Sequence, residues 1–199
     1  MARSRVASWR VKAAVALYLA VLLPAYWRGY GAGNFLWLSD LALFLTAAAL
    51  LLDRPALAAV AACVLPLELA WCADWISGAR LLGLTGYMFD PANPLWLRAL
   101  SLFHLALPPA ILFLLWRHGY SRRALAWQLA LVWSALLASY ALTDPGMNVN
   151  WVFGPFGRTQ QALPPLAWLG LELLAISLLV LLPLDVALRR VFFPPVSAA

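Results

Sequence analysis

The sequence has 199 residues, of which 65% are hydrophobic and only 11% are charged. Because a soluble domain has about 25% charged residues, this composition excludes an ordinary water-soluble protein and indicates an integral membrane protein. The formal net charge of +6 arises from 14 basic and 8 acidic residues. The basic residues lie in short connections between apolar runs, which favours contact with anionic lipid head groups over nucleic-acid binding, so membrane lipids are the expected partners and nucleic acid is not.

Six apolar runs follow one another along the chain. A helix needs about 20 apolar residues to cross a bilayer, and each run approaches or reaches that length. We therefore predict an all-α bundle of six transmembrane helices that forms one transmembrane domain over residues 1–199. The predicted spans are 11–27, 35–52, 56–76, 95–116, 124–142 and 164–188.

Two longer connections, 77–94 and 143–163, separate some of these runs. Cytoplasmic loops of membrane proteins carry an excess of Lys and Arg. If both termini are cytoplasmic, ten of the 14 basic residues lie inside and both longer connections lie outside; the four basic residues outside are Arg28, Arg80, Arg98 and Arg158. We predict a multi-pass protein of the bacterial cytoplasmic (inner) membrane with both termini in the cytoplasm.

The run 95–116 carries His104, the one histidine expected inside the membrane. Trp96 and Trp116 lie 20 residues apart, which is about 30 Å of helix, and tryptophan prefers the two membrane interfaces. The pair therefore marks the two ends of one span. Pro108 and Pro109 are expected to kink this helix below His104.

Ionisable and polar residues of the predicted spans gather in their outer halves. A charged side chain at the bilayer centre costs about 2.5–3.5 kcal/mol on insertion scales, so such groups normally face the bundle interior or a wet cavity. We predict a polar pocket open toward the outer leaflet; a set of ion pairs that only holds the helices in register is the competing interpretation. The predicted pocket residues are Asn34, Asp40, Glu68, Asp74, Arg98, Asn148, Asn150 and Glu172.

Two further expectations concern the outer side of the bundle. Arg98 should pair with an acidic side chain, Asp40, Glu68 or Asp74, because a free guanidinium at that depth would face hydrocarbon. The connection 143–163 should fold over the outer mouth of the bundle, because its many apolar and aromatic residues argue against a solvated linker.

Three segments resemble a group of uncharacterised bacterial six-helix membrane proteins. They are NFLWLSDLALFL, SLFHLALPP, and NVNWVFGPFG followed by LPPLAWLGLELL. More distantly, the layout is similar to the YwaF-like proteins and the androgen-induced-gene family of intramembrane lipid hydrolases and acyltransferases. In that family a Thr or Cys nucleophile in an early helix works with a histidine on a later helix. The matching positions here are Ser39, where serine replaces Thr or Cys, and His104.

The resemblance implies hydrolysis or transfer of an acyl group of a lipid-like substrate. A serine hydroxyl is a weak nucleophile until a base such as histidine accepts its proton. Asp40, Glu68 or Glu172 could orient the imidazole of the histidine. Asn34 or Asn150 could donate to the developing oxyanion.

The alternative belongs to a different class of protein. It is a non-catalytic subunit of a membrane complex, with another membrane protein as its partner, or a small transporter in which the same polar residues are structural. The sequence has no metal-ligand cluster and no nucleotide-binding motif, so neither a metal nor another cofactor is predicted.

Overall fold

The structure, a computed structural model that describes residues 6–192, is all-α, as predicted. About 75% of the chain is helical, and the described part contains no strand. The elements are α1 (Trp9–Tyr30), η1 (Ala32–Leu36), α2 (Leu38–Leu51), α3 (Ala56–Ala61), η2 (Ala62–Val64), α4 (Leu65–Ile76), α5 (Gly86–Phe89), α6 (Leu95–Leu100), α7 (Phe103–His118), α8 (Ala124–Leu142), η3 (Val149–Trp151), η4 (Pro155–Gly157), α9 (Pro165–Ala175), η5 (Ile176–Leu181) and α10 (Leu182–Phe192).

Five helical stretches are long and apolar enough to cross a membrane, which is compatible with a multi-pass membrane protein. They are Trp9–Tyr30, Ala56–Ile76, Leu95–His118, Ala124–Leu142 and Pro165–Phe192. Each coincides with a predicted run to within a few residues. The remaining run, 35–52, forms η1 and the 14-residue apolar helix α2. At 1.5 Å per residue, α2 alone is about 21 Å long, which is shorter than the hydrocarbon core of a bilayer.

The stretch Leu95–His118 contains a break that was not predicted from the sequence. Pro108 and Pro109 lie inside the assigned helix α7, and the break falls at Ser101–Leu102, between α6 and α7. A proline has no N–H to donate, so Pro108 leaves the carbonyl of His104 without its helical partner. The thiol of Cys72 donates to that carbonyl at 3.5 Å, which replaces the missing bond.

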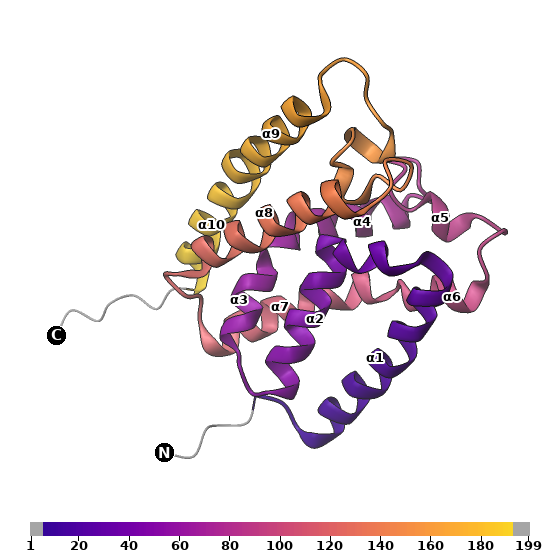
Figure 1. Cartoon of the computed structure of the whole chain (residues 1–199). Helices are drawn as coiled ribbons and strands as arrows, with labels where there is room; N and C mark the ends of the chain where they lie inside the picture. The colour runs from indigo at the N-terminus through magenta and orange to yellow at the C-terminus, as the bar shows by residue number, and fades with distance from the viewer. Residues whose placement is uncertain (1–5, 193–199) are drawn as a thin grey trace.

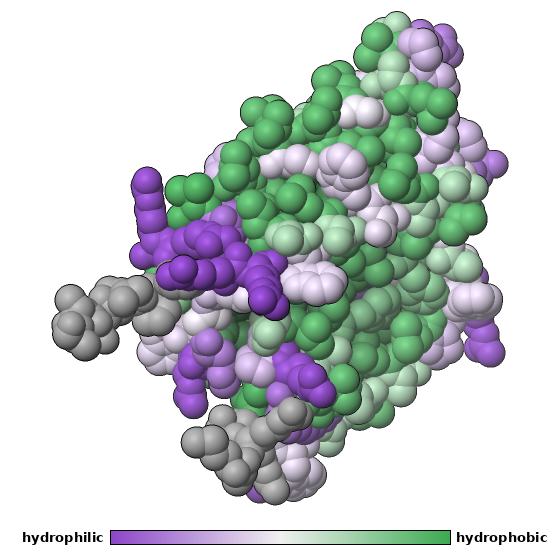
Figure 2. Space-filling view, turned by 60° about the vertical axis from the view of Figure 1, so that its left-hand side comes forward, coloured by the Kyte–Doolittle hydropathy of each residue, from purple (hydrophilic) through white to green (hydrophobic). Residues whose placement is uncertain are grey.

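Small residues allow the central helices to pack closely. Ala42 and Ala49 of α2 and Ala58, Ala59 and Ala61 of α3 are all buried, and α2 and α3 form the most extensive helix contact. Helices approach each other closely in membranes where the interface carries such residues. Figure 1 shows α1 and the continuous α9–α10 segment at the periphery of the bundle. The face shown in Figure 2 is broadly hydrophobic.

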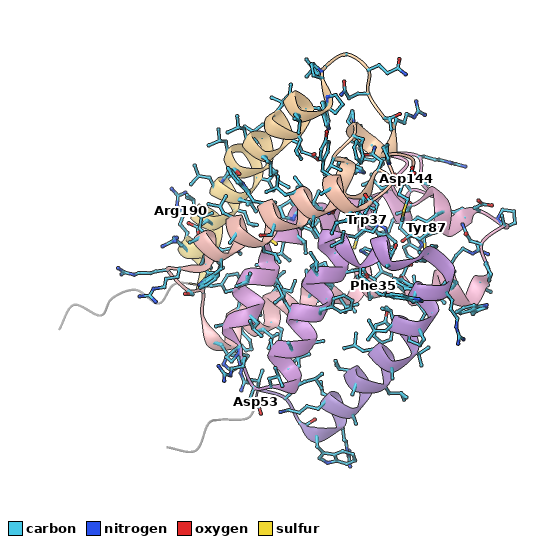
Figure 3. All side chains as sticks on the ribbon, in the orientation of Figure 1. Phe35, Trp37, Asp53, Tyr87, Asp144 and Arg190 are labelled. Atoms are coloured by element: carbon cyan, nitrogen blue, oxygen red, sulfur yellow. The ribbon has the colours of Figure 1, made fainter. Side chains whose placement is uncertain are left out.

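The two ends of the bundle differ in character. At one end, the ammonium of Lys12 pairs with Asp53 at 2.6 Å and holds the pKa of that carboxyl below its usual range. Arg189 pairs with Asp185 at 2.6 Å at the same end, and strongly hydrophilic residues gather there (Figure 2). Figure 3 shows Asp53 and Arg190 far from Trp37, Tyr87 and Asp144, which mark the opposite end.

The two long connections cover this opposite end. The carboxylate of Asp74 holds the connection 77–94 in place by accepting hydrogen bonds from it. Asn150 holds the connection 143–163. Its side chain accepts from the Leu38 amide at 2.9 Å and donates to the Leu36 carbonyl at 2.8 Å. Val149 and Val152 are fully buried. The expectation that 143–163 folds against the bundle is therefore confirmed.

Candidate functional site

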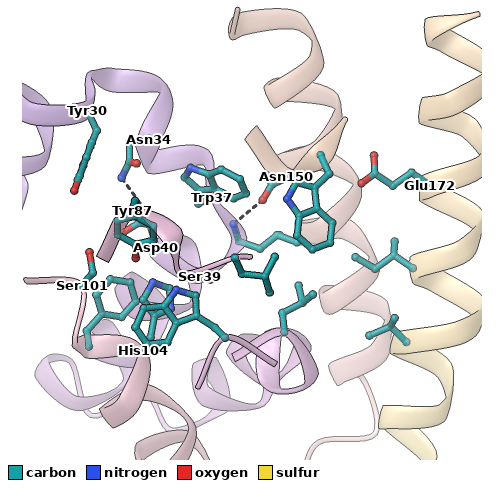
Figure 4. A pocket seen from close by; sticks show the side chains of 18 of the residues that line it. Tyr30, Asn34, Trp37, Ser39, Asp40, Tyr87, Ser101, His104, Asn150 and Glu172 are labelled. Atoms are coloured by element: carbon teal, nitrogen blue, oxygen red, sulfur yellow. Dashed lines mark hydrogen bonds between the residues drawn. The ribbon is translucent and has the colours of Figure 1, made fainter. Parts of the chain in front are cut away.

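A cavity of about 550 Å³ lies between the helices at the end covered by the two connections. The end of α1, the start of α2, the first part of α4, the start of α7 and the end of α9 meet around it (Figure 4). Its volume is in the range typical of small-molecule sites. The polar residues that line it are Tyr26, Tyr30, Asn34, Ser39, Asp40, Tyr87, Ser101, His104, Asn150 and Glu172.

One wall of the cavity is apolar and continues to the outside of the bundle. Ala175, Ile176, Leu179 and Val180 line the cavity from the end of α9 and from η5. Leu179 is also 75% exposed, so the cavity wall is continuous with the outer surface of this helix. The η5 segment is a π-helix, a form that is frequent at functional sites. The cavity thus combines a polar side with an apolar side that reaches the surface.

The imidazole of His104 is held in one orientation at the cavity wall. Its Nδ1 lies 2.7 Å from Oε2 of Glu68, which is fully buried. The rings of Trp71 and Phe103 stack on the imidazole at centroid distances of 4.3 and 4.1 Å. Within residues 6–192, Nε2 has no hydrogen-bond partner. Glu68 is therefore the acid that orients His104, whereas Asp40 and Glu172 make no bond to it.

Ser39 lines the same cavity from the first turn of α2. Its hydroxyl makes no hydrogen bond in the part of the chain that the structure describes, and none joins it to His104. The structure therefore brings the two predicted catalytic residues into one cavity without a direct contact between them.

Asp40 and Glu172 are carboxyl groups with an unused oxygen. Asp40 is only 3% exposed, and its Oδ2 accepts from Nδ2 of Asn34 at 3.1 Å. Among the described residues, Oδ1 of Asp40, Oε2 of Glu172 and the hydroxyl of Tyr30 are buried and have no partner. Figure 4 shows Glu172 on the opposite side of the cavity from Asp40.

Three predicted pocket residues hold the connections in place, and one of them, Asn150, also lines the cavity. Asp74 accepts five hydrogen bonds, from the amides of residues 81–83 and from both the amide and the hydroxyl of Thr85. Asn148 lies in the left-handed region, with φ 41°, and bonds Phe153 and Gly154 within its own loop. Asn150 lines the cavity, but its amide is engaged by Leu36, Leu38 and Ser139.

The predicted pairing of Arg98 with an acid is wrong. Its Nη1 donates to the carbonyl of Met88 at 2.7 Å, and no ion pair of residues 6–192 includes it. Of the candidate acids, Glu68 is engaged by His104 and Asp74 by the backbone of its own connection. Asp40 keeps an oxygen without a partner among the described residues, but Arg98 does not bond it. Arg98 therefore fastens the connection 77–94 and does not line the cavity.

Several residues at the cavity were missed by the sequence reasoning. The hydroxyls of Tyr26 and Ser101 bond each other at 2.7 Å, and Tyr87 lines the cavity from the connection 77–94. Burial raises the pKa of Tyr87, so its hydroxyl stays protonated and remains a donor. The spacing of Tyr26 to Tyr30 and of Ser101 to His104 places each pair on one helix face, which is the signal that could have found them.

Comparisons of the chain with protein families, with characterised proteins and with solved structures gave no match. Within the described residues, no group of three or more His, Cys, Asp and Glu side chains is arranged to hold a metal ion.

Proposed function

We propose that this protein is an intramembrane hydrolase or acyltransferase of a lipid-like substrate, with His104 as the base and Ser39 as the nucleophile. The buried Glu68–His104 pair at the wall of an amphipathic cavity carries the proposal, with Nδ1 and Oε2 2.7 Å apart. When the imidazole donates from Nδ1 to the carboxylate, Nε2 is free to accept a proton. The distant similarity of the helix layout to intramembrane lipid hydrolases, in which Ser39 and His104 take the matching positions, supports the same chemistry.

In this reaction the Ser39 oxygen attacks the ester carbonyl and its proton passes to Nε2 of His104. The imidazolium then gives that proton to the leaving alcohol, and the acyl group remains on Ser39. Water completes a hydrolysis, and a second alcohol completes a transfer. Ser39 must come within about 2.6–3.2 Å of Nε2, and such contacts often tighten only when substrate binds.

The two residues predicted as donors to the oxyanion are partly engaged. One N–H of the Asn34 amide donates to Asp40, and the Asn150 amide donates to both the Leu36 carbonyl and the Ser139 hydroxyl. The hydroxyl of Tyr30 lines the same cavity and has no partner among the described residues. A tyrosine hydroxyl can serve as an oxyanion donor, so Tyr30 takes this role in the proposal.

The proposed setting is the bacterial inner membrane, with η1 and α2 completing six spans and both termini cytoplasmic. The supporting observation is the location of the basic residues Arg54, Arg117, Arg189 and Arg190 at the helix ends away from the cavity. In this orientation the cavity lies in the outer half of the bilayer. Reporter fusions in the loop 119–123 are expected to score as cytoplasmic, and fusions in 143–163 as external; the reverse result would contradict the orientation.

The nucleophile can be tested with a long-chain fluorophosphonate, which labels activated serines. The wild-type protein in detergent is expected to be labelled, and Ser39→Ala is expected to lose the label because no activated hydroxyl remains. Ser101→Ala is the matched control, since Ser101 lines the same cavity but its hydroxyl is bonded to Tyr26. If Ser101→Ala lost the label and Ser39→Ala kept it, the nucleophile would be Ser101 and the proposed role of Ser39 would be wrong.

A non-catalytic role in binding or transport is the second candidate. The specific observations that favour it are that no hydrogen bond joins Ser39 to His104 in the described structure and that both N–H groups of Asn150 are already engaged. Absence of labelling in the wild-type protein and in both serine variants would support this candidate over acyl transfer.

A further inference from the structure

Asp40 is a buried group of the cavity that the proposed acyl chemistry does not use. It lines the cavity from the first turn of α2 and is 3% exposed. Asn34 satisfies only Oδ2, and Oδ1 is buried without a partner among the described residues. A buried acceptor with no donor is unfavourable, and a ligand that brings a donor removes this cost.

The ionisable side chains of the cavity lining are mostly acidic. Asp40 and Glu172 line the cavity, and no Lys or Arg of the described residues does. The nearby guanidinium of Arg98 is directed to the Met88 carbonyl, and the imidazole of His104 is held by Glu68. Since neither of these groups bonds Asp40, the complementary ligand group is a cation.

Aromatic rings surround the same side of the cavity. Tyr30, Trp37 and Tyr87 lie on the side of Asp40, whereas Glu172 lies across the cavity (Figure 4). Aromatic faces attract cations, most strongly where water is excluded. The opposite wall, formed by Ile176, Leu179 and Val180, offers no charge and suits an alkyl chain.

We propose that the cavity selects amphiphiles with a protonated amine head group. The ammonium donates to Oδ1 of Asp40 among the aromatic rings, and the alkyl chain lies along η5 and leaves the bundle past Leu179. This inference rests on the proposed function in that it takes the cavity as the substrate site, and it adds the head-group class of the substrate.

The test uses the full-length protein in detergent and three photoreactive amphiphiles with the same hexadecyl chain. Their head groups are a primary ammonium, a hydroxyl and a carboxylate, and labelled peptides are mapped by mass spectrometry. The ammonium probe is expected to label Ile176–Leu181 about tenfold more strongly than the hydroxyl probe, because hydrogen bonds to a charged partner are the stronger ones. The carboxylate probe should label this segment least, since it meets two carboxyl groups.

The variants identify the residue that recognises the amine. Asp40→Asn keeps the bond to Asn34 but removes the charge, so it is expected to reduce the preference for the ammonium probe about tenfold. Asp40→Glu should retain the preference if the protein folds normally. Asp90→Asn is the matched control, because Asp90 is an exposed acid in the connection 77–94 that does not line the cavity; it should leave the preference unchanged.

The outcomes separate this inference from the proposed function. Equal labelling by the ammonium and hydroxyl probes, or an unchanged preference in Asp40→Asn, would overturn the inference and leave the acyl chemistry standing. Normal ammonium preference together with no fluorophosphonate labelling of Ser39 would contradict the acyl chemistry alone. Failure of every probe to label Ile176–Leu181 would contradict both, because the cavity would then not be an amphiphile site.

Discussion

Replacing His104 by alanine is expected to lower ester turnover by about 10²–10⁴-fold, the usual contribution of a general base. The imidazole is the group at the cavity wall that combines a held orientation with a free nitrogen, since Nδ1 bonds Glu68 and the ring lies between Trp71 and Phe103. The measurement is the hydrolysis rate of a long-chain fluorogenic ester by purified protein in detergent.

Two variants control for effects on folding and positioning. His118→Ala removes the other histidine, which is exposed at the end of α7, and should leave the rate unchanged. Glu68→Gln keeps a hydrogen-bonding side chain beside His104 but loses the charge that stabilises the imidazolium, so a loss of about tenfold is expected. Full turnover in a well-folded His104→Ala protein would rule out His104 as the base.

Replacing Asp74 by alanine is expected to destabilise the protein by about 2–4 kcal/mol, because a hydrogen bond to a charged group contributes about 1.5–3 kcal/mol and several are lost together. Oδ1 accepts from the amides of Leu81, Leu82 and Gly83, and Oδ2 accepts from the amide and hydroxyl of Thr85. Both Asp74 and Thr85 are fully buried. The change can be measured by unfolding in mixed detergent micelles.

The damage should be local to the connection 77–94. Limited proteolysis is expected to cut this connection faster in Asp74→Ala, and the loss of Tyr87 from the cavity wall should weaken amphiphile labelling. Asp90→Ala removes an exposed acid from the same connection, and surface substitutions of this kind usually change stability by less than about 0.5 kcal/mol. Equal stability of Asp74→Ala and Asp90→Ala would show that the Asp74 bonds contribute little.

The helical class and the positions of the long helices follow from the sequence because they depend on local properties. The length and hydropathy of a run are enough to predict a helix, so the runs 56–76 and 124–142 match the observed helices residue for residue. The helix α2 also ends just before the turn Asp53-Arg54-Pro55, because proline has no N–H to continue the helical hydrogen bonds. The sequence also predicts that four ionisable residues gather at one end of the bundle, because the direction of each span alternates along the chain. These residues are Asp40, Glu68, His104 and Glu172.

The partner of each polar side chain was decided by the tertiary structure. Helix depth predicts which side chains share a level, but the rotation of each helix about its axis determines which of them face one another. Glu68 and His104 meet because α4 and α7 pack together, whereas Arg98, at a similar level, donates to the Met88 carbonyl. The sequence therefore determined the fold class and the acidic character of the cavity, while the choice of Glu68 for His104, and the unused oxygen of Asp40, depended on packing between segments far apart in the chain.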